Sequence, residues 1–258
     1  MIIDYFQNTE IIVVLTAVLT GCFVKGAIGF GLPLIATPIM LFVLPLPEVV
    51  ATLALPITMA NLFQIWLNKA HWYILKRFWL LVVSSTIIML FGAPLMVTID
   101  SESLGILIGL MIFLHAAFSY LPVMHIKRFS IPQKNLSKMI VPAGIVSGIF
   151  GSLTSIYSFP SLQLMVMMRV KKDDLNFLLG VFLSLGYIAL WCGISKAGFP
   201  VGDNFILSGL MIIPAIVGQY TGHIARQRIS EKNFRHIVHL ALACAGMILM
   251  IKGLIKFI

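Results

Sequence analysis

Hydrophobic residues run through this 258-residue chain in long blocks that are separated by short polar connections. A block of about 20 apolar residues is long enough to cross the hydrocarbon core of a bilayer as a helix. Six blocks have this length, and they cover residues 49–67, 79–97, 103–121, 175–194, 205–224 and 234–251. We therefore predict six ordinary membrane-spanning helices.

Two further apolar blocks are long for one span and short for two. Residues 11–46 contain a single charged residue, Lys25, and residues 139–168 contain none. Glycine and proline interrupt both blocks, and these residues permit non-helical backbone or remove an N–H donor. Each block is therefore predicted to form a broken or re-entrant segment.

The two broken blocks are related to each other in sequence. A displacement of 122 residues carries the first member of each of three pairs onto the second: Gly26 and Gly148, Gly29 and Gly151, and Pro38 and Pro160. Weaker echoes continue through the rest of the chain. We therefore predict an all-α polytopic membrane protein made of two homologous four-segment repeats, residues 1–125 and residues 126–258.

Composition and charge narrow the class of protein. Hydrophobic residues make up 60% of the chain and charged residues only 10%, with a mean hydropathy of +1.03. A soluble domain carries roughly 25% charged residues, so soluble enzymes and binding modules are excluded. The net charge of +9 comes from basic residues in short loops, which is typical of cytoplasmic loops rather than of nucleic-acid binding. The three cysteines lie in apolar runs, and neither a metal-binding spacing nor a catalytic motif occurs, so no enzyme, metal or cofactor is expected.

The distribution of lysine and arginine discriminates between two topologies. If every block crosses once, 10 basic residues besides Lys25 lie in the cytoplasm and 7 lie outside. If both broken blocks enter and leave on the same side, the numbers become 14 and 3. The positive-inside rule favours the second topology, in which three crossings per half invert the second repeat relative to the first. Eight single crossings in parallel repeats remain the alternative.

The broken segments are also the best candidates for a binding site. A break leaves backbone N–H groups free at the start of the next half-helix, where an anion is favoured. All nine acidic residues lie outside the apolar runs, which disfavours cation exchange through a buried carboxylate and favours an anionic or neutral substrate. Lys25 either adds positive potential to this site or extends toward the membrane interface.

Glycines are expected to shape the first break, and hydroxyl groups are expected to donate hydrogen bonds at the second. The predicted substrate-binding residues are Lys25, Gly26, Gly29, Phe30, Gly31, Gly148, Gly151, Ser152, Thr154, Ser155 and Tyr157. The alternative for each glycine and serine is that it merely permits close helix packing. Polar residues elsewhere in the runs are interpreted as interhelical contacts, and they include Asn61, Gln64 and Tyr187.

The stretch from Gly21 to Pro38, its echo from Gly148 to Pro160 and the four-plus-four layout together resemble the TauE/SafE family of sulfite exporters and toluene-sulfonate uptake permeases. This resemblance implies a multi-pass permease of the bacterial cytoplasmic membrane for small sulfur-containing anions or organosulfonates, such as sulfite or sulfoacetate. It also implies that the paired motifs form the pathway. We expect a secondary transporter that works by alternating access, with the lipid bilayer and a small anion as partners, and a homodimer is compatible with the Gly- and Ala-containing faces. An anion channel, or a structural or assembly protein without a substrate, are the alternatives.

Overall fold

The structure, a computed structural model, describes residues 8–120, 133–228 and 243–251. This described part contains helices joined by turns and loops, with no strand. The helices are α1 (Asn8–Ile28), α2 (Leu32–Met40), α3 (Leu46–Leu67), η1 (Lys69–Ile74), α4 (Leu75–Gly92), α5 (Leu95–Thr98), α6 (Ser101–Tyr120), α8 (Gln133–Lys138), α9 (Ile140–Thr154), α10 (Ser161–Met167), α11 (Lys172–Lys196), α12 (Phe205–Leu210), α13 (Ile212–Arg228) and a helix over residues 243–251. The predicted all-α class is confirmed.

Five helical stretches in the described residues are long and apolar enough to cross a membrane: Glu10–Ile28, Leu46–Leu67, Lys69–Thr98, Lys172–Lys196 and Phe205–Ala225. The predicted block 205–224 is not one continuous helix, because Met211 divides it into α12 and α13. The first part of the predicted block 234–251 and the predicted repeat boundary after residue 125 lie outside the described residues.

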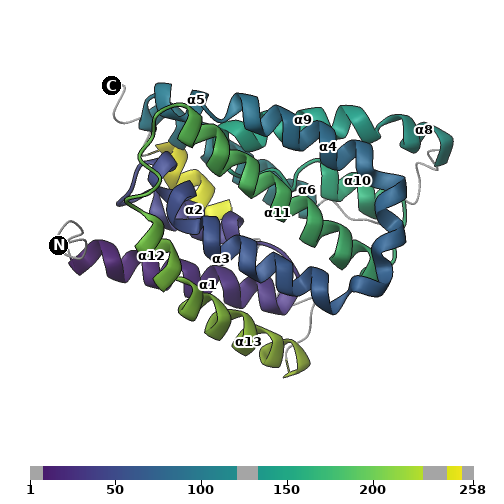
Figure 1. The fold of residues 1–258 in the computed structure, drawn as a ribbon, viewed down its shortest axis with the longest axis horizontal. Helices are drawn as coiled ribbons and strands as arrows, with labels where there is room; N and C mark the ends of the chain where they lie inside the picture. Colours follow the sequence, from purple (N-terminus) through teal and green to yellow (C-terminus); the bar gives the residue numbers. More distant parts are fainter. Residues whose placement is uncertain (1–7, 121–132, 229–242, 252–258) are drawn as a thin grey trace.

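Both broken blocks fold as helical hairpins. In the first, Gly21 of α1 faces Leu32 and Ala36 of α2, so the short helix returns along the longer one. In the second, the Ser147 hydroxyl of α9 lies 2.6 Å from the Ser161 hydroxyl of α10. Figure 1 shows α3 running in the same direction as α1, and α11 in the same direction as α9. Each broken block therefore enters and leaves at one end of the bundle.

The two halves are packed against each other in a reciprocal way. Helix α1 lies along α13, and α9 lies along α4, each pair running in parallel. The first helix of each half thus contacts the third long helix of the other half (Figure 1). Between these pairs, α3 lies antiparallel against α11, with the Gln64 side chain donating a hydrogen bond to the backbone carbonyl of Asn176.

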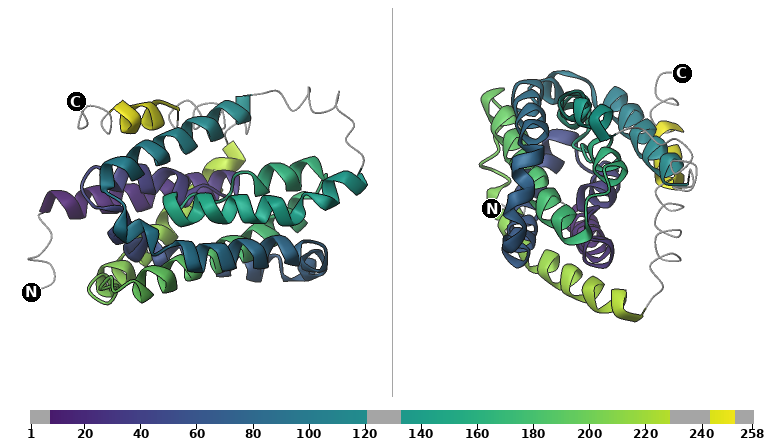
Figure 2. Two further views of the ribbon diagram at one scale, coloured as in Figure 1. Left: turned by 90° about the horizontal axis from the view of Figure 1, so that it is seen from above. Right: turned by 90° about the vertical axis from the view of Figure 1, so that its right-hand side faces the viewer.

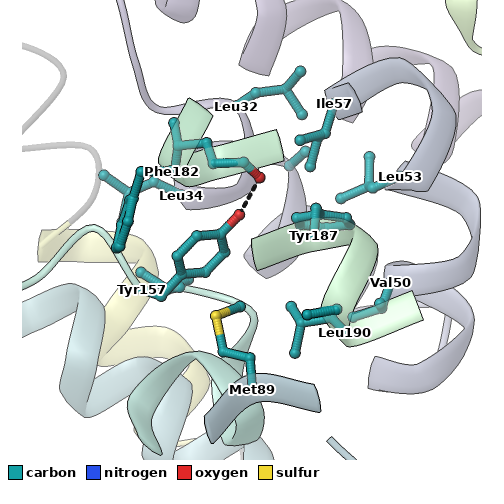
Figure 3. Packing of buried hydrophobic residues seen from close by; sticks show 14 of the residues in the cluster. Leu32, Leu34, Val50, Leu53, Ile57, Met89, Tyr157, Phe182, Tyr187 and Leu190 are labelled. Carbon is teal, nitrogen blue, oxygen red and sulfur yellow. Dashed lines mark hydrogen bonds between the residues drawn. The ribbon is translucent and has the colours of Figure 1, made fainter. Parts of the chain in front are cut away.

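The centre of the bundle is apolar and lies where α3 meets α11. Figure 3 shows Tyr187 of α11 packed beside Leu53 and Ile57 of α3, with Tyr157 and Phe182 next to them. Helix α6 and the helix over residues 243–251 lie side by side at one edge of the bundle (Figure 2).

Basic residues of the connections gather at one end of the bundle. The described ones near η1, α8 and the start of α11 are Lys69, Lys76, Arg77, Lys138, Arg169, Lys171 and Lys172. This end lies to the right in Figure 1, and Lys196 at the end of α11 lies at the opposite end. The arrangement matches the charge asymmetry that favoured hairpins over eight single crossings.

Glycines allow the parallel helix pairs to approach closely. A Cβ atom at Gly222 of α13 would lie 2.0 Å from the carbonyl oxygen of Phe23, so even alanine does not fit there without movement of α1. We expect Gly222→Ala to destabilise the fold by about 1–3 kcal/mol through overpacking, seen as a lower melting temperature of the purified protein in detergent.

A matched control for this substitution is Gly209→Ala in α12. A Cβ atom there meets nothing within 4 Å, so only the better helix propensity of alanine acts. Equal melting temperatures for the two variants would contradict the close approach of α13 to α1.

Candidate functional site

The first break has the backbone that its glycines predict. Between α1 and α2, Gly29 has φ +99° and Gly31 has φ +114°, a region in which side-chain-bearing residues are strained. The Gly29 N–H donates to the Lys25 carbonyl at 2.7 Å and closes the last turn of α1. Gly31 is the N-cap of α2 and supplies no side-chain cap, so the first turn of α2 begins without one. Phe30, between the two glycines, is half-buried and packs against the apolar core.

Three of the other predicted glycines serve helix packing. A Cβ atom at Gly26 would lie 2.2 Å from the Gln219 carbonyl oxygen of α13. At Gly148 it would lie 2.7 Å from the Ile88 side chain of α4, and at Gly151 the same distance from Tyr157 within the second hairpin. These positions hold the hairpins in place, which is the packing alternative that the sequence left open.

The second break begins at Ser155, which ends α9 in a left-handed conformation with φ 59°. Two of its predicted hydroxyl donors are occupied by their own backbone. Ser152 donates to the Ile149 carbonyl at 2.8 Å, and Thr154 donates to the Phe150 carbonyl at 2.7 Å. Because a hydroxyl has a single hydrogen, neither group can donate to a substrate in this conformation.

The start of α10 is already capped by the protein. The Ser161 N–H donates to the Ser147 hydroxyl at 3.2 Å, and the Leu162 N–H donates to the Ser158 carbonyl at 2.7 Å. The sequence predicted free backbone N–H groups at the start of each half-helix that follows a break, where an anion is favoured. In the structure the first turn of α10 finds partners inside its own hairpin, whereas the start of α2 has no side-chain cap.

The two hairpins meet through a pair of hydroxyl groups. Thr37 of α2 and Ser155 at the second break are both fully buried, and their hydroxyl oxygens lie 3.1 Å apart. This contact joins the first half of the chain to the second at positions 118 residues apart. The Tyr187 hydroxyl of α11 also faces Ser155, yet it finds no partner with hydrogen-bond geometry in the described structure.

Tyr157 lies next to this hydroxyl pair but is engaged elsewhere. Its hydroxyl donates to the Leu183 carbonyl of α11, as the dashed line in Figure 3 shows. Its ring packs against Gly186 and at 5.4 Å from the Phe182 ring. Tyr157 therefore anchors the second break to α11.

Lys25 lies in the last turn of α1, and its side chain is buried among the helices. Its side chain is only 3% exposed, and its ammonium group donates to the Oδ1 atom of Asn61 on α3. The one titratable side chain that interacts with it among the described residues is the Cys22 thiol, one helical turn earlier. No described carboxylate is paired with this charge. Because the side chain is buried, it does not extend to the protein surface.

A second polar cluster joins the two halves nearer to the basic end. Asp174 of α11 accepts hydrogen bonds from the Tyr73 hydroxyl at 2.5 Å and from His71 Nδ1 at 2.8 Å. Both donors lie in η1. Asp174 is 6% exposed and is the one acidic residue that is buried among the described residues. Its carboxylate is hydrogen-bonded to His71 and Tyr73.

Sequence reasoning named Lys25 and Ser155 as candidate site residues but did not identify the side chains that contact them. Asn61 and Tyr187 were interpreted as interhelical contacts, and Asn61 does connect α3 with α1. Thr37 had no distinguishing signal, because it lies between the break and a proline in an apolar run. Only the folding of the two hairpins brings these side chains together.

Comparison with known proteins gives one match. The family model described as Sulfite exporter TauE/SafE matches residues 13–249, which is nearly the whole chain. The chain belongs to the TauE/SafE family. No curated protein and no solved structure matches it. Membership in TauE/SafE, together with the apolar helices, makes this a multi-pass membrane protein of a transporter family associated with sulfite.

Proposed function

We propose that this protein is a secondary transporter that moves a small sulfur-containing anion, such as sulfite or an organosulfonate, across the bacterial cytoplasmic membrane by alternating access. The observation that carries the proposal is the buried Lys25 ammonium, whose hydrogen-bond partner is the neutral amide of Asn61. A charge in a membrane interior is costly unless it is paired. An anionic substrate supplies the missing negative charge, and the TauE/SafE match supports a sulfur anion.

The transporter consists, in this proposal, of two inverted repeats, residues 1–125 and residues 126–258. The supporting observations are the directions in which the helices run. Each hairpin enters and leaves at one end of the bundle, and α9 and α11 run opposite to α1 and α3 (Figure 1). Inverted repeats with interrupted helices are a recurring plan of secondary transporters, in which one half rocks against the other.

The substrate path in this proposal follows the interface between the halves. Lys25, in the last turn of α1, pairs with Asn61 of α3, and Thr37 of α2 contacts Ser155 at the second break. Opening of one end requires the His71–Asp174 contact to part, and opening of the other requires the hairpins to separate. Between the opening of one end and the opening of the other, the substrate exchanges its hydration shell for hydrogen bonds from the Lys25 ammonium and the Asn61 amide.

Transport by the purified protein in liposomes tests this function. We expect uptake of labelled sulfite or methanesulfonate to saturate, and we expect an excess of the same unlabelled anion inside to accelerate the initial uptake. That acceleration, known as counterflow, requires a carrier that reorients with its substrate. Saturable uptake without counterflow would favour an anion channel, and no anion flux beyond that of empty liposomes would favour a structural role.

A further inference from the structure

The Lys25–Asn61 pair has an imbalance between hydrogen-bond donors and acceptors. A lysine ammonium carries three donors and no acceptor, whereas an asparagine side chain carries one carbonyl oxygen and an NH₂ group. The carbonyl oxygen of Asn61 accepts from Lys25. Because the ammonium cannot accept a hydrogen bond, this contact fixes the orientation of the amide and turns its NH₂ group away from Lys25.

The NH₂ group of Asn61 has no partner in the described residues, although Asn61 is only 1% exposed. An unpaired polar group in an apolar interior costs several kcal/mol, so a binding partner that supplies acceptors is strongly favoured here. The Lys25 ammonium and the Asn61 NH₂ group are both hydrogen-bond donors, and the Asn61 carbonyl oxygen already accepts from Lys25. The occupant that fits this pair is a group with at least two acceptor oxygens.

The charge of the pair limits the charge of the occupant. Lys25 brings one positive charge, and Asn61 brings none. Asp174, the buried carboxylate among the described residues, is bonded to His71 and Tyr73 and not to Lys25. A singly charged anion therefore makes the buried site neutral. A doubly charged anion would leave one negative charge uncompensated, which is strongly unfavourable in a medium of low dielectric constant.

We propose that Asn61 is a substrate-binding residue and that the Lys25–Asn61 pair selects singly charged oxyanions, such as an alkylsulfonate or hydrogensulfite, over doubly charged ones such as the sulfite dianion or sulfate. This proposal rests on the proposed function and specifies its substrate class. One oxygen of the anion accepts from Lys25, and a second accepts from the NH₂ group of Asn61.

Binding to the detergent-solubilised full chain tests the charge selectivity, with calorimetric titration or ligand-induced shifts in melting temperature as the readout. Methanesulfonate, which carries one charge at every pH of interest, is expected to bind equally well on both sides of neutrality. Sulfate is expected to bind at least tenfold more weakly. Sulfite is expected to bind on the acid side of its second ionisation, where hydrogensulfite predominates, and to lose binding on the alkaline side.

The substitution Asn61→Asp separates substrate binding from a structural role. It keeps the size of the side chain and the contact with Lys25, but it places a carboxylate where the anion would supply its charge. We expect Asn61→Asp to fold, to melt no lower than the wild-type protein, and to lose methanesulfonate affinity by about 10–100-fold, as the loss of hydrogen bonds to a charged group implies. Asn61→Leu is expected to lose the same affinity without forming an ion pair.

The matched control is Asn68→Asp, which makes the same change at the end of α3. Asn68 bonds to the Gln64 carbonyl and has no contact with Lys25, so methanesulfonate affinity should stay within about twofold of the wild-type value. Sulfate affinity equal to that for methanesulfonate would overturn the charge selectivity and leave the anion transporter intact. Unchanged affinity in Asn61→Asp would overturn the role of Asn61. Binding of no sulfur anion by the wild-type chain would overturn this proposal and the proposed function together.

Discussion

Replacing Lys25 with methionine is expected to abolish anion transport and, at the same time, to raise the melting temperature of the unliganded protein. The two effects have one cause. Insertion of a lysine into the centre of a membrane costs about 2.5–3.5 kcal/mol, and a methionine of similar length removes that cost. The same change removes the positive charge that Lys25 presents to the anion in the proposed site.

The expected loss of affinity can be estimated from the hydrogen bond to a charged group. Such bonds contribute about 1.5–3 kcal/mol, which corresponds to roughly 10–100-fold in the dissociation constant for methanesulfonate. Binding titration and uptake into liposomes measure the loss, and thermal unfolding in detergent measures the gain in stability. An interior lysine that only supports the fold would show the opposite change in stability.

Lys196→Met provides the matched control for Lys25→Met. Lys196 ends α11 and is exposed, so its replacement removes the same charge without touching the site. Transport by Lys196→Met should remain within about twofold of the wild-type rate, because exposed charges contribute little. Wild-type uptake by Lys25→Met would contradict the role of Lys25 and, with it, the proposed function.

The helices and the first break could be predicted from the sequence, because each depends on residues that are close together in the chain. A run of apolar residues requires a helix in a membrane, because every backbone N–H and C=O group must find a partner within the chain. Gly29 and Gly31 predicted the first break, because their positive φ angles are accessible mainly to glycine. Ser155 adopts a similar conformation at the second break with no glycine to indicate it, and there its N–H bonds to the Gly151 carbonyl and its hydroxyl contacts Thr37.

The part of the candidate site that could not be predicted depends on contacts between distant segments. Lys25 and Asn61 are 36 residues apart, and Thr37 and Ser155 are 118 residues apart. Helical periodicity gives the face of each helix but not the helix that will cover it. The same limit explains why Gly26 and Gly148 served equally well as candidates for a break or for packing, until the position of α13 and α4 showed packing.

Joining Thr37 to Ser155 by a disulfide is expected to stop transport reversibly. The two hydroxyl oxygens lie 3.1 Å apart across the interface between the halves, so cysteines at both positions would place two thiols close together. If one half rocks against the other during transport, a covalent link at this contact holds the protein in one state. We expect the oxidised Thr37→Cys/Ser155→Cys variant to lose nearly all uptake and to regain it on reduction.

Two controls isolate the effect of the link from the effect of the substitutions. Each single cysteine variant is expected to transport under oxidising conditions, because the native cysteines lie elsewhere. Cys22 is buried in α1, Cys192 is partly buried and Cys244 is exposed. Maleimide labelling after denaturation reports how many thiols remain free, and it confirms the link independently of transport. A fully linked protein that takes up anion at the wild-type rate would mean that the hairpins stay in contact throughout the cycle. In that case the movement that exposes Lys25 to either side must occur elsewhere along the interface between the halves, where the described polar contacts include the His71–Asp174 pair and the Gln64–Asn176 hydrogen bond.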